Sequence, residues 1–340
     1  MVPIFPVVKL LVGIAILYWG AEWLIRGSAG IARGFGVKPL VVGLTVVAYG
    51  TSAPELAVAT KTALEHAQPI ALGTVIGSCA ANISLILGLT ALIAPPTIDG
   101  RIIRREVPVL VGSAIAVPIL FRNGVLSRFE GALLVLCAVI FTIATLTVSA
   151  KITPDDLDKD DDDDGDEAES ASRSGQAEVA GASMGGKAHA RTSPTMAALM
   201  SALGLVLLLA GSYLFVEGGR KIGESVGMSE RMLGLTVIAI GTALPELIGS
   251  LVAASRGHAA LAVGSVIGSN LLNVFLVLGV TACLQPIRLG ERMHVVDLVG
   301  LVVITLLGVV VLRGSRKITR LEGALLVAAY VAFIVCAALL

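Results

Sequence analysis

The chain has 340 residues, of which 56% are hydrophobic and 15% are charged, and its mean hydropathy is +0.90. Soluble domains carry about 25% charged residues, so this composition excludes an ordinary soluble domain and predicts an integral protein of the lipid bilayer, with no nucleic-acid partner. The formal net charge of zero hides a segregation, because residues 154–195 hold 12 of the 25 acids and only 4 of the 25 bases.

Apolar segments long enough to cross a bilayer, which takes about 20 residues, recur along the chain. We expect ten of them, centred near residues 13, 52, 82, 111, 138, 208, 243, 271, 304 and 331. The predicted fold class is therefore an all-α, multi-pass integral membrane protein. Four cysteines lie in apolar stretches without metal-ligand spacing, and we interpret them as packing residues: Cys79, Cys137, Cys283 and Cys336.

The segment 151–195, between the fifth and sixth spans, is the one long hydrophilic stretch. A dense acidic run is followed there by a part rich in Gly, Ser and Ala. Such a composition cannot bury an apolar core, so we expect a disordered, solvated linker. Capture of Ca2+ by the acids, with a regulatory effect, is the alternative, although the run lacks the glycine-hinged loop of an EF-hand.

The parts of the chain on either side of this linker are copies of one unit. Three stretches of the first part return 191 residues later: residues 43–46, 54–56 and 75–78 recur as residues 234–237, 245–247 and 266–269. We therefore expect one five-helix repeat over residues 1–150 and a second over residues 196–340. Because five is odd, the second repeat must be inverted in the membrane. Inverted repeats place a binding site near the midplane and permit alternating access.

Basic residues in the loops set the expected orientation, because short cytoplasmic loops carry an excess of Lys and Arg. The loops on the side of the linker hold a slight excess: Arg26, Arg33, Lys38, Arg101, Arg104, Arg105, Arg313, Arg316, Lys317 and Arg320. We therefore expect the linker in the cytoplasm, both termini outside, and the protein in the plasma (inner) membrane.

Each repeat carries one acid inside an otherwise uncharged apolar span. Glu55 is the only charged residue within residues 39–60, and Glu246 is the only one within residues 232–255. An acid at the centre of a span costs about 3 kcal/mol, so its presence indicates a function. The alternative is a structural carboxyl, protonated or paired with a base, but no Lys, Arg or His lies near these depths. Two acids at matched positions favour a cation site.

A proline precedes each acid, and we expect Pro54 and Pro245 to kink their helices. Proline removes the hydrogen bond that the carbonyl four residues earlier would accept. The freed carbonyls, of Gly50 and Gly241, must find a protein donor, water or a cation inside the membrane. Ca2+ takes about six to eight oxygen ligands, which include carboxylates and backbone carbonyls.

Hydroxyl and amide side chains accompany each acid at helical spacing. Thr51 lies four residues before Glu55, and Thr242 lies four before Glu246, so each pair shares a helix face. The next span of each repeat has a serine and an asparagine four residues apart: Ser78 with Asn82, and Ser269 with Asn273. Four helices would then each direct two oxygen-bearing side chains into one cavity. Hydrogen bonds from the hydroxyls back to their own helices are the alternative.

These motifs resemble the signatures of a known family. Residues 50–55, Gly-Thr-Ser-Ala-Pro-Glu, and residues 241–246, Gly-Thr-Ala-Leu-Pro-Glu, resemble the GTSxPE motif of the sodium/calcium exchangers in the cation/Ca2+ exchanger (CaCA) superfamily. Residues 77–82 and 268–273 resemble the second helix of the α-repeats in that family. The resemblance, to the prokaryotic type with two α-repeats, implies a ten-helix sodium/calcium exchanger fold and exchange of Na+ for Ca2+.

The resemblance also implies a set of ion ligands within α-repeats that cover about residues 40–93 and 231–284. Ca2+ would be held by two acids and two threonine carbonyls: Glu55, Glu246, Thr51 and Thr242. The Na+ positions would share the acids and add serine hydroxyls and alanine carbonyls: Ser52, Ser78, Ser269, Ala48 and Ala239. Asn82 and Asn273 would line the middle of the site.

Two positions depart from the family pattern. Ala243 stands where the motif usually has a hydroxyl residue, so one Na+ ligand is missing or is replaced by water. Asn273 stands where some relatives, including those that also carry K+, have Asp. Its neutral amide argues against K+ transport and leaves only two acids, which weakens the case for strong coupling to protons.

The resulting prediction is a sodium/calcium antiporter that carries Ca2+ and Na+, catalyses no covalent chemistry and needs no cofactor. An H+/Ca2+ exchanger of the same fold is the alternative, in which protons replace Na+. A non-transporting membrane scaffold or receptor, whose paired acids only join helices, is the alternative from a different class of protein.

Overall fold

The computed structural model describes residues 4–35, 39–96, 100–149, 193–289, 295–314 and 317–339. All but the last three residues of the predicted linker lie outside this part of the chain. The linker's predicted disorder and cytoplasmic position therefore stay predictions.

The first half of the described chain is helical apart from one short strand. Its elements are α1 (Ile4–Phe35), α2 (Pro39–Val42), the π-helix η1 (Gly43–Val47), α3 (Ala48–Thr51), α4 (Ala53–Leu64), α5 (Gln68–Ala80), the π-helix η2 (Ala81–Ile86), α6 (Leu87–Ile93), α7 (Gly100–Leu120), the 3-10 helix η3 (Phe121–Asn123), β1 (Val125–Leu126) and α8 (Arg128–Ser149).

The second half has the same order of helices and π-helices. Its elements are α10 (Pro194–Ser225), α11 (Glu230–Leu233), the π-helix η4 (Gly234–Ile238), α12 (Ala239–Thr242), α13 (Leu244–Ser255), α14 (Ala259–Leu272), the π-helix η5 (Asn273–Leu278), α15 (Gly279–Leu284), β2 (Ile287–Arg288), α16 (Val295–Gly314) and α17 (Arg320–Leu339). Its described strand, however, lies before α16, whereas β1 follows α7. The strands β1 and β2 pair antiparallel and link the two halves, a small departure from the predicted all-α fold.

Eight helices of the described residues are long and apolar enough to cross a membrane, and each contains one of the predicted span centres. A ninth span results if Gly234–Thr242 and Leu244–Ser255, which meet at a 47° bend, are taken together. The prediction of a nearly all-helical, multi-pass membrane protein is confirmed. The segment predicted around residue 52 is not among these spans, so the count of ten stays a prediction.

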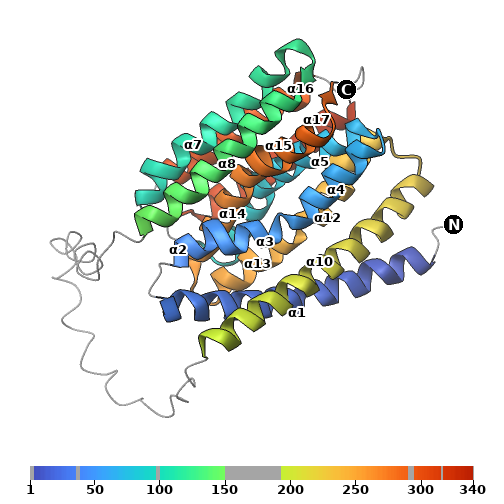
Figure 1. Ribbon diagram of the computed structural model, residues 1–340. Coiled ribbons are helices and arrows are strands. Elements are labelled where there is room, and N and C mark those ends of the chain that lie inside the picture. Colours follow the sequence, from blue (N-terminus) through green and yellow to red (C-terminus); the bar gives the residue numbers. More distant parts are fainter. Residues whose placement is uncertain are drawn as a thin grey trace, which may run out of the picture.

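The long helices α1 and α10 lie side by side along one edge of the molecule (Figure 1). Glycines spaced by seven residues form their contact: Gly13, Gly20 and Gly27 on α1, and Gly204, Gly211 and Gly218 on α10. A Cβ atom at Gly20 would lie 2.9 Å from the carbonyl oxygen of Gly204, and one at Gly211 would lie 2.8 Å from that of Gly13. The backbones of the two antiparallel helices are therefore in direct contact, as small residues permit in membrane helices.

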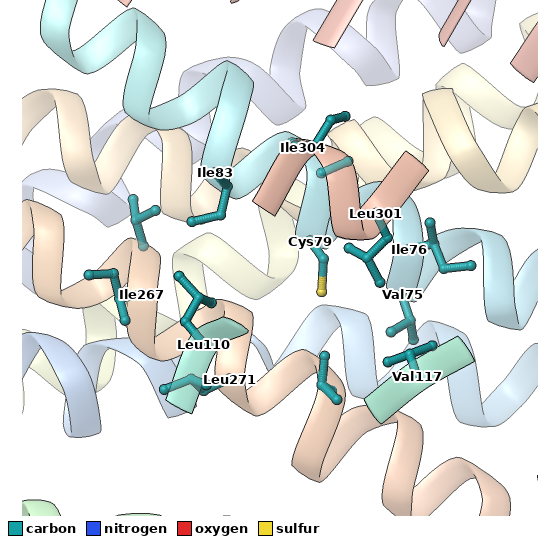
Figure 2. Packing of buried hydrophobic residues seen from close by; sticks show 14 of the residues in the cluster. Val75, Ile76, Cys79, Ile83, Leu110, Val117, Ile267, Leu271, Leu301 and Ile304 are labelled. Atoms are coloured by element: carbon teal, nitrogen blue, oxygen red, sulfur yellow. The ribbon is translucent and has the colours of Figure 1, made fainter. Parts of the chain in front are cut away.

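The core of the molecule surrounds α5 and α14, which are almost entirely buried. Figure 2 shows Val75, Ile76 and Cys79 of α5 among apolar side chains that include Leu271 of α14 and Leu301 of α16. Each central helix also packs on the other half of the chain, α5 against η4 and α12, and α14 against η1 and α3. This exchange of partners brings the motifs of the two halves together.

Glycine residues allow α5 and α14 to pack on the other half, because the helices approach so closely that no side chain would fit at these positions. A Cβ atom at Gly77 of α5 would lie 2.7 Å from the carbonyl oxygen of Leu235, and one at Gly268 of α14 would lie 2.9 Å from that of Leu44. These glycines belong to the matched Val-Ile-Gly-Ser stretches, and each immediately precedes a serine of the predicted site.

Candidate cation site

Both acid-bearing helices are interrupted just before the acid. The backbone breaks at Ser52, with φ −79° and ψ 1°, and at Ala243, with φ −83° and ψ 0°. Pro54 and Pro245 follow in the first turn of α4 and α13, where a missing N–H costs no intrahelical hydrogen bond. The predicted kink at Pro245 thus takes the form of a 47° bend between two separate helices.

The interruption places each acid at a helix N-terminus. Glu55 lies in the first turn of α4, and Glu246 lies in the first turn of α13. The positive end of a helix dipole favours a carboxylate there, which offsets part of the cost of a buried charge. The sequence predicted acids in the middle of a span and did not indicate this stabilisation.

The two acids are completely buried, with 0% of each residue exposed. None of their four carboxylate oxygens has a hydrogen-bond partner among the described residues. Glu55 lies within electrostatic reach of Glu246, so the two carboxylates repel each other when both are ionised. A buried charge without a partner is unfavourable, and an external cation is the natural counter-charge for two such groups.

Hydroxyls of the two halves meet in pairs. Thr51 and Ser269 have their side-chain oxygens 3.4 Å apart, and Ser78 and Thr242 have theirs 3.4 Å apart as well. Most approaches of hydroxyls to the acids also cross between halves. Thr242 approaches Glu55, and Thr51 and Ser52 approach Glu246, which Ser269 of its own half approaches as well.

Some of these hydroxyls also hydrogen-bond to backbone carbonyls. Thr51 donates to the carbonyl of Val47 at 2.9 Å, in the helical back-bond that was the alternative interpretation of such residues. Ser78 instead donates across the halves to the carbonyl of Ala239 at 3.4 Å. The carbonyl of Ala48 also accepts the N–H of Ser52 at 3.0 Å, and the carbonyl of Ala239 also accepts the N–H of Ala243 at 3.0 Å and the hydroxyl of Thr242 at 3.2 Å.

Two amides complete the cluster. Asn82 and Asn273 are 0% exposed, and neither their oxygen nor their nitrogen atoms find partners within the described ranges. The hydroxyl of Ser52 is buried and unpartnered too. Leaving a buried polar group unpartnered costs about 1–3 kcal/mol, so a cluster of such groups drawn from both halves has the character of a binding site.

Comparison with known proteins decides the family. Residues 5–147 and 196–339 match the family described as sodium/calcium exchanger protein, which covers most of both halves. The chain belongs to the sodium/calcium exchanger family. Members of this family are transporters, so the protein is a cation/Ca2+ exchanger of the membrane and not an enzyme.

Relatives match over nearly their whole length. The putative antiporter CaxA of Alkalimonas amylolytica is 34% identical over 328 residues, 95% of this chain and 95% of CaxA. The sodium/calcium exchanger MaX1 of Methanosarcina acetivorans is 30% identical over 349 residues, 96% of either chain. The solved structure of the sodium-calcium exchanger NCX_Mj, soaked with 2.5 mM Na+ and 0.1 mM Ca2+, superimposes with a TM-score of 0.76 at 31% identity and covers 98% of this chain and 99% of its own.

The structure of the exchanger adds features that the sequence analysis missed. Four π-helical segments lie at matched positions of the halves, and two of them contain the site amides: η2 holds Asn82, and η5 begins at Asn273. π-Helical turns are rare and frequent at functional sites. Ser250, four residues after Glu246, is a buried hydroxyl without a partner in the described chain, and its spacing alone could have revealed it.

The freed carbonyls have different surroundings in the two halves. Gly241 receives a hydrogen bond of 3.0 Å from the hydroxyl of Ser212 on α10. A protein donor, water or a cation was expected for this carbonyl, and in this half the donor belongs to the protein. Among the side chains that the structure describes, none donates a hydrogen bond to the carbonyl of Gly50.

Proposed function

We propose that the exchanger moves Na+ against Ca2+ across the plasma (inner) membrane by alternating access, at one midplane site built on Glu55 and Glu246. The observation that carries this proposal is a pair of completely buried carboxylates, one from each half, that interact electrostatically and have no hydrogen-bond partner among the described residues. One Ca2+ balances their charge. Without a cation they repel, which favours the entry of Na+ after Ca2+ leaves.

The ligand set follows from the oxygen atoms around the acids. For Ca2+ we propose the two carboxylates together with the backbone carbonyls of Thr51 and Thr242, because Ca2+ takes about six to eight oxygen ligands. For Na+ we propose the same acids with additional oxygens from both halves: the hydroxyls of Ser52, Ser78 and Ser269 and the carbonyls of Ala48 and Ala239. Asn82 and Asn273 would line the middle of the site between the two sets.

The architecture that serves this mechanism would be two inverted five-helix repeats, over residues 1–150 and 196–340, with ten spans in total. Three observations support it. Helix breaks occur at Ser52 and Ala243, 191 residues apart, and π-helical segments recur at matched positions. The glycine contacts of α1 and α10 are also related by the same shift, within an antiparallel pair.

The names and titles of relatives support Na+ as the coupling ion. MaX1 is called a sodium/calcium exchanger, and NCX_Mj is described as a sodium-calcium exchanger in structures soaked with Na+, Ca2+ and Sr2+. Among the described residues, no group of three or more His, Cys, Asp and Glu side chains is arranged to hold a metal ion. The proposed ligands are only two carboxylates, Glu55 and Glu246, with neutral oxygens, and such a set suits a cation that must be released again.

The deciding experiment uses the purified protein in vesicles loaded with radioactive Ca2+, with Na+, K+ and H+ gradients applied one at a time. We expect an inward Na+ gradient to drive Ca2+ efflux and a K+ gradient to have no effect. Efflux that follows a proton gradient but ignores Na+ would replace this proposal with H+/Ca2+ exchange. Absence of flux under every gradient, from protein that remains folded, would overturn the proposed exchange.

A further inference from the structure

Ser212 connects α10 to the helix break of the second half. Its side chain is 1% exposed, and its hydroxyl donates to the carbonyl oxygen of Gly241 at 3.0 Å. Pro245 deprives this carbonyl of the N–H that a continuous helix would supply. A carbonyl without a hydrogen-bond partner is unfavourable in a membrane interior. The Ser212 hydroxyl supplies the hydrogen bond that the backbone cannot supply there, and so stabilises the helix break.

Two apolar side chains of α10 also pack closely against Gly241. A Cβ atom at Gly241 would lie 2.8 Å from Cδ1 of Phe215 and 2.9 Å from Cγ2 of Val216. Residues three and four apart share one face of a helix, so Ser212, Phe215 and Val216 form a single surface. Gly241 is therefore fixed against α10 by one hydrogen bond and by close packing.

The described part of the first half does not form this arrangement. The glycines of the helix pair correspond at a shift of 191 residues, Gly20 with Gly211, which makes Ala21 the counterpart of Ser212. Alanine has no hydroxyl to donate. The nearest atom to a Cβ at Gly50 is Cδ1 of Leu205, 3.0 Å away on α10, which is an apolar group.

The oxygens next to Gly241 are those assigned to cations. Thr242 follows it directly, with its hydroxyl 3.4 Å from that of Ser78, and Ala239 precedes it by two residues, with a carbonyl that accepts the N–H of Ala243 at 3.0 Å. Rotation of the peptide at Gly241 would redirect these groups. Its fixation by Ser212 therefore fixes their direction as well.

We propose that Ser212 is a positioning residue for cation binding, an inference that rests on the proposed exchange function. Its hydroxyl keeps the Gly241 carbonyl out of the ion site and holds the oxygens of Thr242 and Ala239 in place. The carbonyl of Gly50, to which no described side chain donates, stays available to a cation or to water. The two halves of the site are thus unequal, and the second half is the more rigid one.

The test compares Ser212→Ala with wild type in proteoliposomes, by measuring the ion concentrations for half-maximal exchange and the maximal rate. A buried hydrogen bond contributes enough for us to expect half-maximal concentrations of Na+ and Ca2+ about two- to tenfold higher. Ser212→Thr keeps the hydroxyl and should restore the wild-type values. Ser225→Ala is the matched control on α10, because Ser225 is exposed and donates only within its own helix, to the carbonyl of Ile222 at 2.6 Å.

The readouts separate positioning from stability. A lower unfolding temperature of Ser212→Ala with unchanged half-maximal concentrations would overturn the proposal, because it would reduce Ser212 to a packing role. If Ser212→Ala does not fold, Ser212→Cys keeps the size with a weaker donor, and we expect the same rise in half-maximal concentrations.

A second measurement keeps this inference distinct from the exchange function. Amide hydrogen exchange at residues 239–247 should be faster in Ser212→Ala than in wild type, and Ca2+ should protect wild type more. Equal rates of amide hydrogen exchange in Ser212→Ala and wild type would contradict the positioning role. Wild type that shows no Na+-driven flux, but shows this Ca2+ protection, would refute the exchange function alone.

Discussion

Thr51 and Ser269 stand 218 residues apart in the chain, yet their hydroxyl oxygens lie 3.4 Å from each other. This contact exists because α14 packs on the segment that carries Thr51, and not on the helices of its own half alone. In the same way, α5 of the first half packs on α12 of the second, which brings the hydroxyls of Ser78 and Thr242 together. The hydroxyls near the two acids therefore come from both halves of the chain, as the proposed cation site requires.

Glu55→Gln and Glu246→Gln test this shared site. Each change replaces a carboxylate by an amide of nearly the same shape and removes half of the negative charge. We expect Ca2+ exchange to fall to background in both variants. Expression and unfolding temperature should stay near wild type, because a neutral group is easier to bury than a charge.

The measurement is Na+-driven Ca2+ flux in proteoliposomes, with protein folding followed by size-exclusion chromatography. Glu65→Gln serves as the control, because the side chain of Glu65 is 58% exposed and pairs only loosely with Lys61, at 3.9 Å. Full activity in both site variants would refute the assigned carboxylates.

Ala243→Ser addresses the missing hydroxyl of the second half. Ala243 has nearly the same backbone angles as Ser52, and both residues are 2% exposed, so a serine fits the backbone at this position. An added oxygen ligand should raise the apparent affinity for Na+ by about two- to tenfold, the range of one hydrogen-bond-sized interaction. The dependence of Ca2+ efflux on Na+ concentration measures it.

Ser52→Ala is the converse change and should lower the apparent Na+ affinity. An unchanged Na+ dependence in Ala243→Ser, together with a weaker one in Ser52→Ala, would show that only the first half supplies a hydroxyl. If neither variant changes the Na+ dependence, position 52 and its counterpart are not Na+ ligands.

The sequence was sufficient to predict a nearly all-helical membrane protein and to single out the paired acids. Lone acids such as Glu55 and Glu246 are conspicuous in apolar segments, and matched repeats remove much of the ambiguity. The prolines marked the helix breaks to within two residues, because Pro54 and Pro245 are accommodated in the first turn after the break. The roles of individual ligands, and the number of spans, stay predictions.

Other features had no signal in a single sequence. A π-helical turn depends on which carbonyl each N–H reaches, and the residues of η2 and η5 differ in most positions. The hydrogen bond from Ser212 to Gly241 depends on how α10 lies against α12, which spacing along the chain does not fix. The packing of α5 against η4 of the other half likewise has no signal in the sequence.

Acidic pH should inhibit Ca2+ exchange. Protons and Ca2+ compete for the same carboxylates, and a protonated acid neither balances Ca2+ nor offers two ligand oxygens. Because the binding form is the deprotonated one, activity is highest at alkaline pH and is lost as pH falls. Initial rates of Ca2+ uptake between about pH 8 and 5, a range that ends near the ordinary pKa of glutamate, measure this effect, and higher Ca2+ concentrations should relieve the inhibition. Ca2+ uptake that does not change over this pH range would contradict the competition of protons with Ca2+ for Glu55 and Glu246.

Gly204→Ala tests the backbone contact between α1 and α10. A Cβ atom at Gly204 would lie 2.3 Å from the backbone nitrogen of Leu24, and a backbone atom cannot move aside as a flexible side chain can. The two helices must therefore separate or shift, and overpacking of this kind costs about 1–3 kcal/mol. We expect a lower unfolding temperature in detergent and a reduced exchange rate.

Gly112→Ala on α7 is the matched control for that change. Gly112 is exposed, and a Cβ atom there would meet no atom within 4 Å, so alanine should fit freely. Alanine is favoured over glycine inside a helix by about 1 kcal/mol, which predicts equal or higher stability for this variant. The same substitution should thus have opposite effects on the unfolding temperature at the two sites. If Gly204→Ala proved as stable and as active as Gly112→Ala, the helices could not be in backbone contact at Gly204, and the register of the glycines would have to be wrong.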